Sequence, residues 1–92
     1  MIQTIFMNIN ELISTVKKKI RDNISLEKID VEDKTFLHKN HDSHELGKFH
    51  LKLIIQSVEL KKMSKIESTK KIYAILSEEL KQYIHSIQIL IN

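Results

Sequence analysis

The sequence lacks the residues on which several kinds of functional site depend. It contains no cysteine, no proline and no tryptophan, and its single glycine is Gly47. Without cysteine the chain can form no disulfide, can offer no thiolate to zinc or to an all-cysteine iron–sulfur cluster, and has no cysteine nucleophile. One glycine also excludes the multi-glycine phosphate loops, which are the P-loop, the dinucleotide fingerprint and the GxxG clamp of RNA-binding KH domains.

Long apolar runs are missing as well. No stretch approaches the ~20 apolar residues of a membrane span, and the first residues lack the basic start and the unbroken apolar core of a secretory signal. We therefore expect a cytoplasmic protein that does not enter a membrane.

What is present is the composition of one small globular domain. The 92 residues are 41% apolar and 29% charged, and 15 Lys and Arg against 12 Asp and Glu give a net charge of +3. This composition is typical of a soluble, folded chain, although a chain of this length buries only about 60% of the surface that its unfolded form exposes. We expect a single domain over residues 8–92, preceded by an N-terminal extension, residues 1–7, to which no element is assigned.

Hydrophobic periodicity predicts two helices. Apolar residues at steps of three and four predict a helix over residues 8–24, begun by a capping box in which Asn8 and Glu11 bond each other's backbone. A second capping box, Ser64 with Glu67, begins a helix predicted over residues 65–81. The apolar stripe of that helix, predicted to be its buried side, is formed by Ile66, Tyr73, Leu76 and Leu80, with Thr69 in the same row and Ile72 beside it.

Alternation of apolar and polar residues predicts three strands, at residues 28–32, 49–56 and 84–91. Residues 33–48 show no period and are predicted to be a long loop, and a short helix or turn is expected within residues 59–63. The order is α-β-β-α-β. Because a helix links the last two strands, the sequence predicts an α+β fold with a three-stranded mixed sheet and its helices packed on one face.

The sequence is rich in histidine, with five such residues. His38, His41 and His44 are spaced by three in the predicted loop, and His50 and His85 lie in predicted strands. Imidazole is a common ligand of borderline transition metals, so direct zinc or nickel binding by the three loop histidines is one interpretation. The competing interpretation is structural. The three loop histidines would then be solvated, His50 would face water from the polar side of its strand, and His85 would pack on the side of Ile87 and Ile89. Because no residues form a catalytic constellation, we expect no enzyme.

The segments VEDKTFLHKNH, GKFHLKLII, IYAILSEEL and YIHSIQI resemble, in this order and spacing, the BolA family, whose members show DESHxHxGH, GSHFxVxIV, VxxxLAEEL and VHAL. The resemblance spans residues 31–89 and implies a BolA-like fold, which is of the class II KH-like type. The departures lie in the family's RHR element, which becomes Ser68, Thr69 and Lys70, and in its FxG turn, which becomes Leu60, Lys61 and Lys62.

The resemblance implies a partner and a cofactor. BolA proteins pair with monothiol glutaredoxins, and the two chains share a 2Fe-2S cluster: a glutaredoxin cysteine and glutathione hold one iron, and the BolA terminal histidine and a loop histidine or cysteine hold the other. The terminal histidine falls on His85. The loop ligand falls on His38 when counted forward from Asp33 and on His41 when counted back from His50. The isolated chain is expected to hold no cofactor and to be a monomer or a weak homodimer.

The KH-like fold implies an alternative function, nucleic-acid binding in transcriptional regulation. The candidate phosphate-facing residues are Lys61, Lys62, Lys65, Lys70 and Lys71, and a pI near 9.2 permits it. A net charge of only +3, few aromatic side chains and the missing GxxG loop count against it, so a solvated helix face is the favoured interpretation of these lysines.

Overall fold

A computed structural model describes residues 7–35 and 48–92 of the chain. Within these ranges the helices and strands follow one another in an order close to the predicted one. The elements are α1 (Ile9–Asn23), β1 (Lys28–Asp33), β2 (Phe49–Gln56), α2 (Val58–Lys61), α3 (Lys65–Ile75), α4 (Ser77–Gln82) and β3 (Ile84–Ile91). The short α2 is the helix or turn expected between the second strand and the second helix. None of the described helices is long and apolar enough to cross a bilayer.

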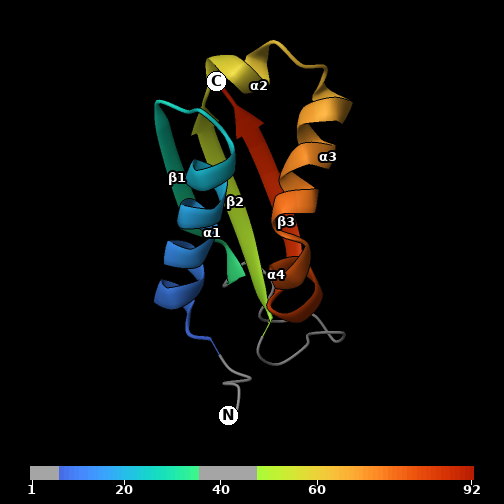
Figure 1. Ribbon diagram of the computed structural model, residues 1–92. Coiled ribbons are helices and arrows are strands. Elements are labelled where there is room, and N and C mark those ends of the chain that lie inside the picture. Colours follow the sequence, from blue (N-terminus) through green and yellow to red (C-terminus); the bar gives the residue numbers. More distant parts are fainter. Residues whose placement is uncertain (1–6, 36–47) are drawn as a thin grey trace.

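The three strands form one mixed sheet in the order β1-β2-β3. β1 runs antiparallel to β2, whereas β3 runs parallel to it after the crossover through α2, α3 and α4. Helices α1 and α3 lie on the same face of this sheet (Figure 1). The predicted α+β architecture is therefore confirmed.

The core lies between the helices and the sheet. α1 buries Leu12, Val16 and Ile20, and β2 contributes Leu51, Leu53 and Ile55 from its covered face. Each such side chain stabilises the fold by about 1.5–3 kcal/mol through the removal of apolar surface from water. The alternate residues of β2, Lys52 and Ile54 among them, lie on the opposite face and are only partly buried.

Both predicted capping boxes are confirmed. The Asn8 side chain accepts a hydrogen bond from the backbone N–H of Glu11 at 2.8 Å, and the Glu11 carboxylate accepts one from the Asn8 N–H at 3.2 Å. Ser64 and Glu67 repeat the arrangement, with both distances at 3.1 Å. These reciprocal bonds satisfy backbone donors that the first turn of a helix leaves unpaired.

The predicted helix over residues 65–81 is interrupted. At Leu76 the backbone leaves helical geometry, with φ −99° and ψ 20°, and separates α3 from α4. No proline or glycine marks the break in the sequence, so the 3.6-residue pattern runs through it. The chain therefore reaches the start of β3 through two helices instead of one.

The predicted buried stripe of this segment is also wrong in part. Ile66 is 68% exposed and Tyr73 is 44% exposed, whereas Leu76 and Ile72 of the predicted stripe are buried, together with Ser68 and Glu79. Two of these buried residues are polar and have their own partners, which is why an apolar pattern misses them. The Ser68 hydroxyl donates to the Lys65 carbonyl at 3.1 Å, and the carboxylate of Glu79 pairs with the ammonium of Lys19.

Candidate metal centre

His50 and His85 lie side by side where β2 and β3 begin. Their ring centroids are 4.9 Å apart, and the ring planes are tilted by 57°. The two rings come together because β3 has one extra residue at this point: Phe49 pairs with Ile84, but His50 pairs with Ser86. An extra residue of this kind, a β-bulge, changes the direction of the neighbouring side chains.

The bulge corrects the prediction for His85. We expected this side chain to be packed on the side of Ile87 and Ile89, but His85 is exposed and contacts His50 instead. Strict alternation places His85 on the wrong side because the extra residue shifts the register by one. An exposed imidazole at a strand end is accessible to a partner or a metal ion.

His50 also differs from the prediction, since it does not face water. Only 8% of the residue is exposed, and its Nδ1 lies 2.6 Å from the hydroxyl oxygen of Ser86, with which it forms a hydrogen bond. The pairing partner on β3 thus fixes the orientation of the ring. We name His50, His85 and Ser86 the histidine end of the sheet.

The backbone of His50 is bonded to the last described residues before the predicted loop. Its N–H donates to the hydroxyl of Thr35 at 3.2 Å, and its carbonyl accepts from the N–H of Lys34 at 2.7 Å. The chain therefore leaves the described region at Thr35, directly beside His50, and returns at Lys48. The predicted candidates His38, His41 and His44 lie outside the described residues.

At the histidine end, the described residues bring together two groups that can bind a metal, the imidazoles of His50 and His85. Within residues 7–35 and 48–92, no group of three or more His, Asp or Glu side chains is placed to hold a metal ion. Because imidazole nitrogens suit zinc, copper, nickel and iron, the donor set fits a site that is completed by ligands from elsewhere. The pair by itself fills about half of a four-coordinate shell.

The predicted lysine residues are divided between two environments. Lys61 and Lys65 line a cleft of about 330 Å³ between the α2–α3 turn and the end of β3, and Lys62 and Lys70 are exposed nearby. The other residues that line this lysine cleft are Leu60, Met63, Ser68, Thr69, Ile89, Leu90 and Ile91. Lys71 is not part of it, because its Nζ binds the carboxylate of Glu59 at 2.8 Å.

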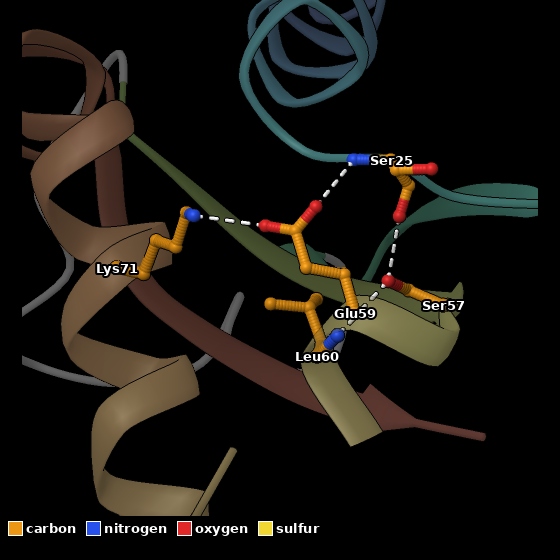
Figure 2. A network of polar contacts seen from close by, with 5 residues as sticks. All are labelled: Ser25, Ser57, Glu59, Leu60 and Lys71. Atoms are coloured by element: carbon orange, nitrogen blue, oxygen red, sulfur yellow. Dashed lines mark hydrogen bonds and ion pairs between the residues drawn. The ribbon is translucent and has the colours of Figure 1, made fainter. Parts of the chain in front are cut away.

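Glu59 is a polar junction that sequence patterns do not reveal (Figure 2). One carboxylate oxygen accepts from Lys71, and the other accepts from the backbone N–H of Ser25 at 2.9 Å. The hydrogen bond from Lys71, followed by that from Ser25, lowers the pKa of Glu59. Beside it the Ser57 hydroxyl donates to the Ser25 carbonyl at 2.7 Å and accepts from the Leu60 N–H at 3.1 Å. The junction ties the α1–β1 turn to α2 and α3, and its partners are too distant in sequence for a local pattern to indicate them.

Known structures share the fold of this chain. The BolA domain of SufE1 from Arabidopsis thaliana aligns with a TM-score of 0.76 at 24% identity, over 92% of this chain and 94% of that one. BolA1 from Arabidopsis thaliana aligns with a TM-score of 0.71 at 20% identity, over 87% and 88% of the two chains. The solution structure of BolA1 from Mus musculus aligns with a TM-score of 0.70 at 17% identity, over 98% of this chain and 69% of that one.

The comparison of sequences agrees with the comparison of folds. A search of curated proteins gave no match, but the family model described as BolA-like protein matches residues 20–92. That match includes the whole sheet and the histidine end. The chain therefore belongs to the BolA family.

Proposed function

We propose that this chain is a non-enzymatic adaptor that binds a monothiol glutaredoxin and helps to hold a 2Fe-2S cluster, in iron–sulfur cluster trafficking or in iron and redox sensing. The observation that carries the proposal is the exposure of His85 on its bulge, next to His50 and to the point where the chain departs at Thr35. An accessible imidazole at this end can ligate an iron that a partner presents.

Chain length supports a second ligand from the predicted loop. A fully extended chain spans at most ~3.6 Å per residue, so the Cα atom of His38 stays within about 11 Å of the Cα of Thr35. For His41 the corresponding limit is about 22 Å. Both residues remain candidates for the second ligand, and the tether is shorter for His38.

The missing cysteine is consistent with this role, because the thiolates of such a cluster come from the glutaredoxin and from glutathione. This chain would supply neutral nitrogens to one iron, as in Rieske centres, and would favour a higher reduction potential than four thiolates give. An imidazole must be deprotonated to bind a metal, so we expect ligation to weaken as the pH falls through about 6.

The proposal is tested by mixing the chain with a cluster-loaded monothiol glutaredoxin. We expect a heterodimer in size-exclusion chromatography and a change in visible circular dichroism relative to the glutaredoxin alone. His85→Ala should abolish that change, whereas His44→Ala, a matched change in the predicted loop, should keep it. Spectra of His85→Ala that are identical to those of the unmodified chain would refute the ligand assignment.

The lysine cleft supports a second candidate, the binding of nucleic acid. Lys61 and Lys65 line this cleft together with apolar residues such as Leu60 and Ile89, so their ammonium groups could hold backbone phosphates. Binding through these lysines should weaken steeply with salt, and Lys61→Gln with Lys65→Gln should reduce the salt slope by roughly two. A gel shift that shows no complex even at low ionic strength would eliminate this candidate.

A further inference from the structure

We infer that His50 and His85 form a metal-binding pair of their own, which takes a single borderline divalent ion such as Zn²⁺ without any partner protein. His50 is a residue to which the sequence patterns give no role. The inference shares His85 with the proposed function, but it requires neither a glutaredoxin nor a cluster.

The spacing of the rings fits one ion between them. Two imidazoles bound to the same tetrahedral ion, with metal–nitrogen bonds of about 2.1 Å, have their ring centroids roughly 5 Å apart. The centroids of His50 and His85 are 4.9 Å apart, and the tilt of 57° keeps the rings from stacking face to face. The separation of the two rings therefore matches that of two imidazoles on one ion.

Ser86 defines which nitrogen of His50 takes part. Its hydroxyl is bonded to Nδ1 at 2.6 Å, so His50 would ligate through Nε2 while Nδ1 donates to the serine oxygen. Metal-bound histidines typically give their other ring N–H to such an oxygen, which fixes the tautomer and the ring orientation. The structure thus contains the supporting bond of a metal ligand next to an exposed second imidazole.

His50 is also held in place before any ion binds. The residue is almost fully buried. Its backbone N–H donates to the Thr35 hydroxyl and its carbonyl accepts from the Lys34 N–H, both just after β1. A ligand that is already ordered loses little entropy on binding. His85 is exposed and supplies access, and the remaining positions of the ion would be filled by water, as in open zinc sites.

The test uses the full chain with His38, His41 and His44 all changed to alanine, so that His50 and His85 are the only histidines left. Zn²⁺ is added while long-range ¹H–¹⁵N NMR spectra report each ring nitrogen. We expect one equivalent of Zn²⁺ to shift Nε2 of His50 and one nitrogen of His85 together, with a single midpoint. His85→Ala should remove the shift of His50.

Variants of His50 and Ser86 separate ligation from structure. His50→Phe fills the buried space without a nitrogen, and Ser86→Ala keeps both imidazoles but removes the supporting bond. We expect each to lower the zinc affinity of His85 by about tenfold or more. If His85 binds Zn²⁺ equally well in His50→Phe, or if the two rings shift at different zinc concentrations, the inference is wrong.

The same experiment keeps this inference apart from the proposed function. If the chain alone binds no Zn²⁺, but the spectrum of its glutaredoxin complex still depends on His85, the histidine pair is overturned and the proposed function is not. A zinc site that depends on both histidines, in a chain that forms no complex with a cluster-loaded glutaredoxin, would support the pair and overturn the proposed function.

Discussion

Glu59 holds its charge between two donors, the ammonium of Lys71 and the backbone N–H of Ser25. Both hydrogen bonds lower the pKa of its carboxyl in the folded chain, and the bond from Lys71 has the larger effect. A lowered folded pKa stabilises the fold above the unfolded pKa, which is about 4.3 for Glu. This stabilisation is lost as the pH falls through the folded value.

Glu59→Gln should therefore lower the urea midpoint of unfolding at neutral pH, and the difference from the unmodified chain should vanish at strongly acidic pH. Urea unfolding followed by circular dichroism at both pH values measures this. Glu27→Gln removes the same charge from an exposed glutamate and serves as the control. A Glu59→Gln midpoint that differs from the unmodified one equally at both pH values would contradict the role of the carboxylate charge.

The histidines show how far single residues can be interpreted from the sequence. The family motif identifies His85 as a candidate because its spacing from the preceding helix is local. The neighbour of His85 is not local, because His50 stands 35 positions earlier and meets it only through the bulge in β3. His50 is buried beside His85. The alternation of β2 places His50 on the polar side of the strand and therefore predicts a solvent-exposed side chain, which is wrong.

At the scale of elements, Lys19 joins α1 to α4 through a close ion pair with Glu79 and a longer one, at 4.0 Å, with the exposed Glu78. The Nζ of Lys19 lies 2.7 Å from Oε2 of Glu79, whose side chain is only 5% exposed. The other carboxylate oxygen of Glu79 is buried without a hydrogen-bond partner among the described residues. Removal of the lysine would leave this buried carboxylate unpaired.

We predict that Lys19→Met lowers the free energy of unfolding by about 2 kcal/mol, because an unpaired buried charge is costly. Lys18→Met is the matched control on the same helix, since Lys18 pairs with Asp22 in an exposed i,i+4 contact. It should cost about 0.5 kcal/mol or less. Equal urea midpoints for the two variants would show that Glu79 does not depend on Lys19.

The start of α3 offers a second test at this scale. Ser64→Ala removes the side chain that accepts from the Glu67 N–H and should lower the free energy of unfolding by about 1 kcal/mol. Ser77→Ala changes an exposed serine in the first turn of α4 that caps nothing, so its effect should be much smaller. Thermal unfolding of both variants measures the difference, and a larger loss in Ser77→Ala would contradict the capping assignment.

Elements with a local signal were predictable, and elements defined by distant contacts were not. Alternation gives β3 its observed bounds, Ile84–Ile91, and the capping boxes mark where α1 and α3 begin. The break at Leu76 has no proline or glycine to mark it, and Ser68 and Glu79 are buried although they are polar. No apolar period can indicate a buried polar residue, and the ion-pair partner of Glu79 lies on another helix, α1.

In the molecule as a whole, the two candidate sites occupy opposite ends of the sheet. His85 is the second residue of β3, whereas Ile89, Leu90 and Ile91 at the other end of the strand line the lysine cleft. Six residues of extended strand separate the ends by roughly 20 Å. Figure 1 shows α2 and the C-terminus at one end of the sheet and the start of β3 at the other.

Sites this far apart should act independently. We predict that Lys61→Gln with Lys65→Gln leaves the visible circular dichroism of the glutaredoxin complex unchanged, and that His85→Ala leaves any salt-dependent gel shift unchanged. Measurement of both assays on all variants checks this. Loss of the glutaredoxin spectrum in the lysine variant would show that the cleft belongs to the same interface.

The topology was predictable because one helix between two strands implies a parallel pair, and the mixed sheet follows from it. The junction at Glu59 was not, because Ser25, Glu59 and Lys71 come from three separate segments. The sequence predicts that the candidate metal ligands are histidines, but it does not predict which histidines lie together. Which imidazoles meet depends on the register of β2 against β3.

The most direct measurement is the hyperfine coupling of histidine nitrogens to the reduced cluster. The chain is labelled with ¹⁵N-histidine, bound to an unlabelled, cluster-loaded monothiol glutaredoxin, and examined by pulsed electron paramagnetic resonance. We predict strong ¹⁵N coupling in the unmodified complex and the loss of at least one such coupling in His85→Ala. A complex that carries its cluster with no ¹⁵N coupling at all would contradict ligation by this chain.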